Sequence, residues 1–549
     1  MRQGWIVTAQ DIIQWTKTNR RQAQSTLPLL VRKLIIASVN PTLLNIPAGD
    51  SISVAGWDGI LKVKEGNMFV PQGDSVWEFG TNARINIKAN EDYEKRTKDP
   101  RGLNKKKNTF IFVTSQTWNK RSDWEKNKNC ENEWAQVKVL NADDLETWLE
   151  QCPAVHRWFS RLIGKRPEGT WDIEQAWDGW SNVTQPPCNM NLVLAGRQDQ
   201  VDDLEKRLKG EASTIRISGE SEDEAYAFAL AVIKSNFQFS TRLLVVREVN
   251  EWDILIDSQQ PLILIPQFDN PHNLGLATKR GNWIILPASS MHFGARKADI
   301  SLRKPDRVKQ ITALMMMGLD EGKAKEIVNS SRGYLNPIRR HAALVSSDYI
   351  PPNWATSEHA GLLLAALFAG SWVSDNNNDC DKLAQLANIS YSEFETLLQH
   401  WRIENDRPID LVGNVWQIIS RQDVWPLLCQ FINTSMLRRF EKTAKEVMLE
   451  IDPRFELPPD ERWQANVRGK LMKHSNWLRH GLIEMMAILA NYGDLDCRNI
   501  GVHSIQDQVS YWINQLLLED MSTLRWASLA KELPLLAEAA PETFIEAMF

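Results

Sequence analysis

Two carboxylates and a lysine in the N-terminal part of the chain form a pattern that fits phosphodiester chemistry. Asp58 lies in the sequence GWDG, Glu78 lies in SVWEFG, and Lys88 opens the basic stretch IKANEDYEKRT. Carboxylates on adjacent strands bind a hard divalent cation through oxygen, and a nearby lysine can polarise the attacking water and the scissile phosphate. The three residues therefore predict a catalytic site, with magnesium or manganese held by Asp58 and Glu78.

A structural role is the alternative interpretation of the same residues. Asp58 can hydrogen-bond the backbone of its own Gly-Trp-Asp-Gly turn, and Glu78 can simply pair with Lys88 or Arg84. Both interpretations are compatible with the spacing of these residues in the sequence.

A basic stretch follows the three residues and predicts contact with nucleic acid, because lysine and arginine neutralise phosphates without regard to base sequence. Trp118 and Trp124 lie a little further on, where they can stack on bases or pack in a core. A solvated loop is the alternative for the charges. The predicted nucleic-acid-binding residues are Lys95, Arg96, Lys98, Arg101, Lys105, Lys106 and Lys107.

Composition narrows the class of protein without naming a function. The chain has 549 residues, a formal net charge of -5 and 23 tryptophans, which predicts two to four soluble domains with tryptophans between helices. Six cysteines show no CxxC spacing, which favours a reducing cytoplasm. The beginning of the chain does not read as a signal peptide, and the longest apolar run is too short to span a bilayer, so we expect no membrane partner.

Elements of an α/β domain are expected over residues 1–165, in an order that places the three residues on neighbouring elements. Apolar residues recur at helical spacing over 6–38, and a charged helix is expected over 89–97. A final helix is expected around 143–163. The predicted strands of this domain are 52–63, 67–70, 75–88 and 108–115.

The rest of the chain predicts a second sheet followed by helices, so that the whole is a multidomain α/β plus α protein. Four apolar runs, with a helical pattern between the first two, indicate a parallel doubly wound sheet. Two helices and a hairpin over 380–420 indicate a winged helix. The apolar C-terminal helices indicate a protein partner, self-association or a chain that continues in relatives. The predicted parts are a linker at 166–191, a sheet domain at 192–303, a helical lid at 304–350, a winged helix at 351–430 and a helical domain at 431–549.

Residues 25–150 resemble the restriction-endonuclease-like superfamily, whose core carries an aspartate, then an acidic residue, one intervening residue and a lysine. Asp58 matches the first acid and Glu78 the second, but Gly80 stands where the lysine is expected. Lysine migrates to a neighbouring element in some members, so Lys88 is the substitute, and a second frame uses Asn86 to Lys88. The resemblance implies magnesium-dependent cleavage or binding of double-stranded DNA.

Residues 192–232 resemble the entry to a STAND-type ATPase, the signal-transduction branch of P-loop proteins, in which Arg197 matches the position near the nucleotide base. The phosphate loop is altered: Gly219 is followed by an acidic stretch through Glu224 without the lysine that phosphate requires. Carboxylates at a helix start repel phosphate. The second nucleotide motif also lacks its acid, with Asp269 the nearest candidate. We expect neither ATP hydrolysis nor nucleotide binding.

Two functions therefore compete. Proteins that join these two kinds of domain to helices resemble bacterial antiphage defence proteins, which implies a cytoplasmic DNA endonuclease or a nuclease-derived DNA-binding protein. The alternative is a non-enzymatic scaffold or sensor that binds a protein partner through its helical C-terminal half. Whether the chain is an enzyme depends on the site at Asp58 and Glu78.

Overall fold

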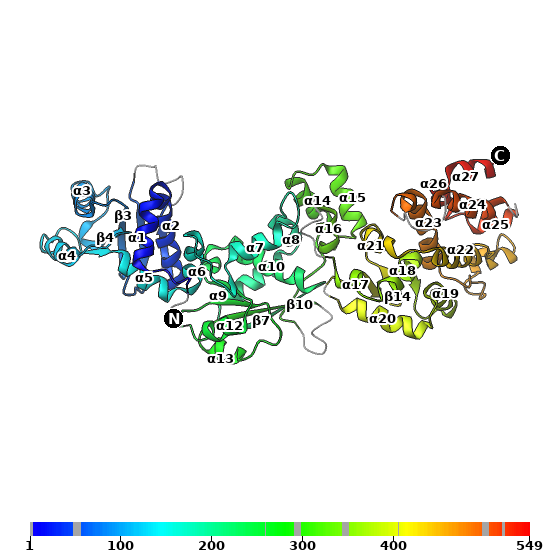
Figure 1. Cartoon of the computed structure of the whole chain (residues 1–549), viewed down its shortest axis with the longest axis horizontal. Helices are drawn as coiled ribbons and strands as arrows, with labels where there is room; N and C mark the ends of the chain where they lie inside the picture. Colours follow the sequence, from blue (N-terminus) through cyan, green and yellow to red (C-terminus); the bar gives the residue numbers. More distant parts are fainter. Residues whose placement is uncertain are drawn as a thin grey trace.

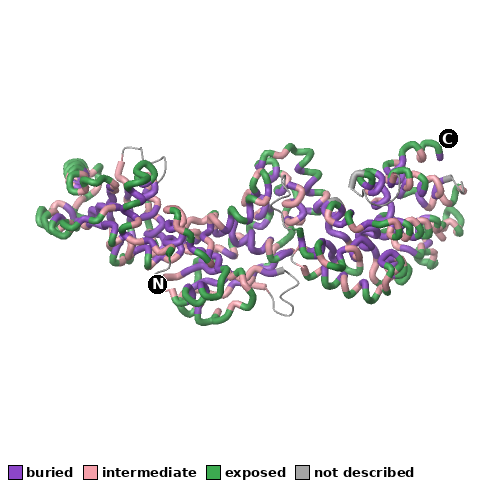
Figure 2. The backbone as a smooth tube through the Cα atoms, viewed as in Figure 1, coloured by how far each residue is buried: buried purple, intermediate pink, exposed green. Residues whose placement is uncertain are grey.

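The protein is a mixed α/β chain of several units that follow one another along its long axis, from the N-terminal unit to the helical C-terminal half (Figure 1). The computed structural model describes residues 4–47, 56–258, 260–289, 298–342, 351–404, 406–496, 504–518 and 522–548. Buried residues follow the middle of each unit, and exposed residues cover the outer helices (Figure 2).

The N-terminal unit is built on a five-stranded mixed sheet in the order β1-β2-β3-β4-β5. Strands β1 to β3 are antiparallel neighbours, whereas β3, β4 and β5 run parallel. The strands are β1 (Pro41–Asn45), β2 (Gly59–Val63), β3 (Gly73–Gly80), β4 (Asn108–Thr114) and β5 (Gln136–Leu140). The helices are α1 (Ala9–Thr18), α2 (Arg20–Ser38), α3 (Ile85–Lys98), α4 (Arg121–Cys130), α5 (Ala142–Gln151) and α6 (Pro153–Leu162).

Helices cover both faces of this sheet because its strands bury side chains on both sides. Trp77 of β3 packs in the core that α2, α5 and α6 form on one face. Its neighbour Val76 packs with Tyr93 of α3 and Trp124 of α4 on the other face. Side chains alternate along a strand, so Glu78 points to the face that α3 covers.

Three local predictions in this unit are wrong. The helix expected over 6–38 is two helices, because the chain breaks between α1 and α2 at Asn19. No strand forms over 67–70, where the Asn67 side chain accepts from the backbone N–H groups of Phe69 and Val70 and closes a turn. The strand expected over 75–88 ends at Gly80, and its last residues open α3. Residues 52–55 lie outside the described residues.

The central unit contains a six-stranded sheet in the order β11-β7-β10-β9-β8-β6. The four apolar runs form β7, β8, β9 and β10, which are parallel as predicted. The strands are β6 (Thr170–Trp171), β7 (Thr214–Gly219), β8 (Leu243–Val246), β9 (Ile263–Pro266), β10 (Trp283–Ser289) and β11 (Ile300–Ser301). The helices are α7 (Ile173–Ser181), α8 (Met190–Leu194), α9 (Gln198–Lys209), α10 (Glu222–Ser235), α11 (Phe237–Ser240), α12 (Val249–Leu255) and α13 (Leu274–Lys279).

The segment 166–191 is part of this unit and not a linker. Its strand β6 pairs antiparallel with β8 and so extends the sheet. Trp177 and Trp180 of α7 are buried in the same core as α10. The Pro-, Gly- and Trp-rich composition looked irregular, but two large indole side chains bury enough apolar surface to fix the segment.

In the described residues of the C-terminal half, the chain is helical apart from one small sheet in the order β12-β14-β13, which contains the predicted hairpin. The expected lid is α14 (Arg307–Met316), α15 (Glu321–Ser330) and α16 (Leu335–Ala342), which share the central core. The next elements are α17 (Asn353–Thr356), α18 (Ala360–Ala369), β12 (Ser371–Val373), α19 (Asn377–Ala387), α20 (Tyr391–Ile403), β13 (Ile409–Val412) and β14 (Val415–Ile418). The last helices are α21 (Arg421–Leu428), α22 (Thr434–Met448), α23 (Asn476–Asp496), α24 (Ile505–Leu518), α25 (Thr523–Ser528), α26 (Leu533–Ala539) and α27 (Pro541–Met548). Among the described residues, no helix is both long and apolar enough to cross a membrane.

Close packing around Gly481 joins α23 to the end of α18. The Arg421 side chain donates to the Gly481 carbonyl at 2.7 Å. A Cβ atom on Gly481 would lie 1.8 Å from the carbonyl oxygen of Ala369. Neither backbone has room to move, because both belong to buried helices of one core.

We expect Gly481→Ala to destabilise the C-terminal half by about 3 kcal/mol, since the added methyl group forces α18 and α23 apart. Urea unfolding followed by tryptophan fluorescence measures the change. Gly361→Ala in α18 is the matched control, because its Cβ atom would approach nothing closer than 4.0 Å. Equal stability of the two variants would show that this contact is not constrained.

Candidate functional site

A small cavity lies at the carboxyl end of β3 and is lined by two of the three predicted catalytic residues, whereas Glu78 does not line it. Its volume is about 220 Å³, and both Asp58 and Lys88 line it. The other lining residues are Gln24, Pro28, Pro47, Trp57, Phe79, Gly80, Thr81 and Asn82. The predicted pair of Asp58 and Lys88 is therefore brought to one place, and polar residues of α2 and of the loop after β3 join it.

Asp58 immediately precedes β2 and connects it to β3. Its Oδ2 atom accepts a hydrogen bond from the backbone N–H of Phe79 at 3.1 Å. The side chain is half-buried, so the carboxylate still borders the cavity. Asp58 therefore does bind a backbone N–H group, as the alternative interpretation expects. The group belongs to Phe79 on β3, however, and not to the Gly-Trp-Asp-Gly turn itself.

Glu78 is buried and already holds a cation. The Nε atom of Arg96 donates to Glu78 Oε1, and both side chains are 4% exposed. Burial and the charge of Asp58 raise the pKa of Glu78 to about 8, against the opposing effect of Arg96. The prediction that Glu78 pairs with Lys88 or Arg84 is wrong, because its partner is Arg96.

The stem of Lys88 passes near Gly80, where the motif lysine of the resemblance is missing. A Cβ atom on Gly80 would lie 2.6 Å from Phe112 Cζ and 3.4 Å from Lys88 Cγ, so the phenylalanine ring fills the space above the glycine and the lysine stem lies beside it. The Lys88 Nζ atom pairs with Asp92 Oδ1 at 2.7 Å. Burial lowers the pKa of Lys88, but the hydrogen bond and charge of Asp92 outweigh it, so that the pKa is raised.

The three charged residues of α3 that serve this site recur at a spacing of four. Lys88, Asp92 and Arg96 lie on one helical face, which points to the sheet face of Glu78. The spacing of four is visible in the sequence, but the prediction that Arg96 binds nucleic acid is wrong, and Asp92 is a residue of the site that the sequence analysis does not identify. Arg96 is 4% exposed and bonded, so it does not contribute to an exposed basic surface.

The remaining basic residues lie at the far end of α3 from Lys88. Helix α3 starts near the end of β3 and returns to the start of β4, because β3 and β4 are parallel. Lys88 and Lys98 are therefore about 15 Å apart along the helix axis. Lys95, Lys98, Arg101, Lys106 and Lys107 are exposed there, whereas Lys105 pairs with Glu133 at 2.6 Å. The cavity and the basic cluster are two separate places.

The two tryptophans beside the basic stretch belong to the core. Trp118 is 9% exposed and Trp124 is 7% exposed, and their rings pack against each other. Trp124 donates through its indole N–H to Asn90. Packing is therefore their role, and they are not platforms for bases.

Divalent metal does not fit the carboxylates in this arrangement. One Glu78 oxygen is taken by the Arg96 guanidinium, and one Asp58 oxygen is taken by the Phe79 amide. No group of three or more metal-ligating His, Cys, Asp or Glu side chains occurs within the described parts of the chain. A cation held at Glu78 would first require the guanidinium to leave.

The loop after β7 in the central unit also holds a carboxylate of its own. Glu224 Oε1 accepts from Arg197 at 2.5 Å, and Glu224 Oε2 accepts from the backbone N–H of Glu220 at 2.7 Å. Both ionic side chains are at most 2% exposed. Arg197 thus binds a protein carboxylate at the entry of α10, the place where a helix start and loop would otherwise attract an anion.

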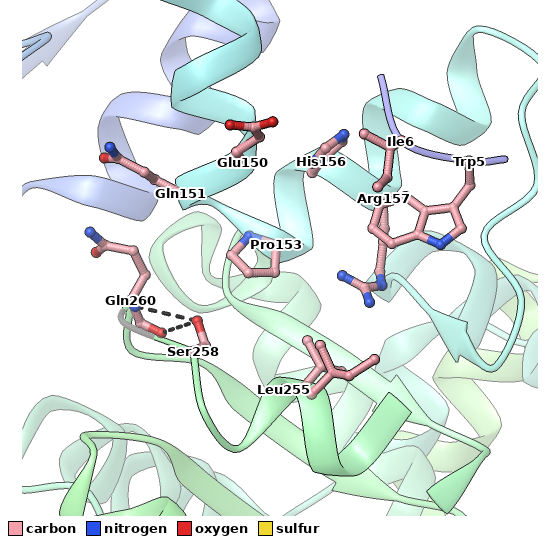
Figure 3. A pocket seen from close by; sticks show the side chains of 11 residues that line it. Trp5, Ile6, Glu150, Gln151, Pro153, His156, Arg157, Leu255, Ser258 and Gln260 are labelled. Atoms are coloured by element: carbon pink, nitrogen blue, oxygen red, sulfur yellow. Dashed lines mark hydrogen bonds between the residues drawn. The ribbon is translucent and has the colours of Figure 1, made fainter. Parts of the chain in front are cut away.

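The junction between the N-terminal and central units contains a cavity of about 490 Å³ (Figure 3). Arg157 lies against Trp5, with its guanidinium carbon 4.4 Å from the ring centroid, and pairs with Glu251 of α12. His156 accepts from the Val7 N–H at 2.9 Å. Ser160 and Lys165 bond the carbonyls of Trp5 and Ile6. These contacts fasten residues 5–7 and join the two units.

Comparison with known proteins adds no family to this picture. No protein-family model and no curated protein sequence matches the chain.

The raised pKa of Glu78 predicts a pH dependence of stability. The pKa of Glu78 in the folded protein lies above the ordinary value of 4.5, so protonation of this carboxyl stabilises the folded state. The stabilisation is complete below pH 4.5 and is lost as the pH rises through about 8. We expect the apparent Tm of the N-terminal unit to fall less between about pH 5 and pH 9 in Glu78→Gln than in the wild type. Calorimetry measures it, with exposed Glu94→Gln as control. Parallel slopes would contradict the raised pKa.

Loss of the Glu224 carboxylate is expected to leave Arg197 charged and buried without its partner. We expect Glu224→Ala to destabilise the central unit by about 3 to 5 kcal/mol. Glu222→Ala, two residues earlier and exposed, is the matched control. Chemical denaturation compares the two, and a loss below about 1 kcal/mol in Glu224→Ala would mean that the pair is not needed.

Proposed function

We propose that the chain is a nuclease-derived protein that binds double-stranded DNA and belongs to bacterial antiphage defence. The observation that carries this proposal is that Lys88 and Asp58 line one cavity beside Gly80, at the end of the strand that carries Glu78. An acid on β3, an acid before β2 and a lysine from the next helix form the group that the restriction-endonuclease resemblance requires. The order of a helix, three antiparallel strands, a helix and a parallel strand supports the same origin.

Binding is favoured over cleavage because the site holds its own cation. The Arg96 guanidinium neutralises Glu78, so a hydrolytic metal has no free pair of carboxylates. Exposed lysines at the end of α3 and before β4 supply the sequence-independent attraction to phosphates. Helices α3 and α4 lie at the outer end of the N-terminal unit, away from the central unit (Figure 1).

The central unit is proposed to be a STAND-like module that holds no nucleotide. Its parallel sheet places the loop after β7 at the start of α10, as in P-loop proteins. The bound carboxylate of Glu224 supports the loss of phosphate binding. The helices α19 and α20 with the hairpin β13–β14 fit a winged helix that packs on neighbouring helices.

A non-enzymatic scaffold is the second candidate, and the buried pair of Glu78 and Arg96 favours it. Such a protein would need neither DNA nor metal, and would bind a protein partner or a second copy through its C-terminal helices. The two candidates differ in whether purified protein binds a DNA duplex.

We expect duplex DNA to bind the wild-type chain, and the substitution of Lys95, Lys98 and Lys107 by glutamine to weaken binding at least ten-fold. The slope of log K against the logarithm of the salt concentration should become shallower by about 3, because three phosphate contacts are lost. Fluorescence anisotropy with a labelled duplex at several salt concentrations measures both. The control replaces three other exposed lysines, Lys309, Lys323 and Lys442, with the same change of charge.

Each other result has a defined meaning. Equal weakening in both triple variants would indicate a general charge effect and reject the proposed surface. No binding by the wild type would favour the scaffold. Metal-dependent nicking of a plasmid that is lost in Asp58→Asn would instead establish an active endonuclease.

A further inference from the structure

We propose that Arg96 is the resident cation of the nuclease-like site, in the place where a divalent metal would otherwise be held. Its guanidinium donates to two hard oxygen atoms at once, a carboxylate oxygen of Glu78 and the carbonyl oxygen of Gly56. Glu78 is one of the two predicted metal ligands, and Gly56 is two residues before the other, Asp58. Carboxylate and carbonyl oxygens are the ligands that magnesium and manganese take from proteins.

The surroundings hold the guanidinium in this position. Its carbon lies 4.7 Å from the centroid of the Trp57 ring, so the planar group stacks on the residue between Gly56 and Asp58. Arg96 is fixed through its acceptors on two sides and through the ring on a third. Because Arg96 and Glu78 are both 4% exposed, removal of either partner leaves a charge in a site that excludes water.

The balance of charge supports a replacement. Once Glu78 is ionised, above its pKa of about 8, Lys88 and Arg96 leave one uncompensated negative charge among Asp58, Glu78 and Asp92, which influence one another electrostatically. A divalent ion added to that set would reverse the net charge of the buried site. Loss of the Arg96 charge leaves two negative charges, which a divalent ion matches.

This inference deepens the proposed function, because it gives the physical reason why a nuclease-derived site would bind DNA without cutting it. Its own evidence is the contact geometry of Arg96, which does not depend on DNA. The experiment therefore measures the binding of metal in the absence of DNA, and DNA binding is measured separately.

The test measures the affinity of the full chain for Mn²⁺ by electron paramagnetic resonance at about pH 8. We expect Arg96→Gln to bind one Mn²⁺ at least ten-fold more tightly than the wild type. Arg96→Lys keeps a cation and should resemble the wild type. The double variant Arg96→Gln with Glu78→Gln should lose the gained site. Duplex DNA affinity of Arg96→Gln should stay within about three-fold of the wild type, since Arg96 is buried.

Two results would overturn the inference. One is a wild-type Mn²⁺ site that Glu78→Gln removes, because metal and guanidinium would then share the site. This comparison does not need the Arg96→Gln chain to fold. The other is a folded Arg96→Gln chain, checked by circular dichroism, without gained Mn²⁺ affinity. If Arg96→Gln unfolds more easily, Mn²⁺ should raise its Tm and leave that of the wild type unchanged; a failure of this rescue also counts against the inference.

Discussion

The crossover from β3 to β4 through α3 determines where the charges of the N-terminal unit lie. Two parallel strands need a connection that returns along the sheet, and α3 is that connection. Its first turns therefore lie beside Gly80, and its last turn lies beside the start of β4. The same helix carries Lys88 to the cavity and Lys98 to the opposite end of the sheet. One topological constraint thus separates the site from the basic cluster.

An arginine pairs with a buried glutamate in both the N-terminal and the central unit. Arg96 holds Glu78 in the first sheet, and Arg197 holds Glu224 in the second. A third pair, Arg157 and Glu251, joins the two units. A buried ion pair is a poor source of net stability, but it strongly disfavours any arrangement that leaves one partner alone. Such pairs therefore specify one arrangement of the elements that carry them.

The sequence predicted well those features that depend on local patterns. The four apolar runs became parallel strands, and the hairpin after α20 formed as expected. The proximity of Asp58 and Lys88 was also foreseen. Pairing between Glu78 and Arg96 was not, because it depends on which face of α3 meets β3. Trp177 and Trp180 made residues 166–191 part of a core, which composition alone did not indicate.

The fastening of residues 5–7 has a consequence for synthesis on the ribosome. The partners of this segment, His156, Ser160 and Lys165, are made long after it. Arg157, on which Trp5 packs, finds Glu251 later still. Residues 5–7 must therefore wait, without their final contacts, until α6 has left the exit tunnel. Their docking marks the completion of the N-terminal unit during translation, and it ties that unit's assembly to the arrival of the next one.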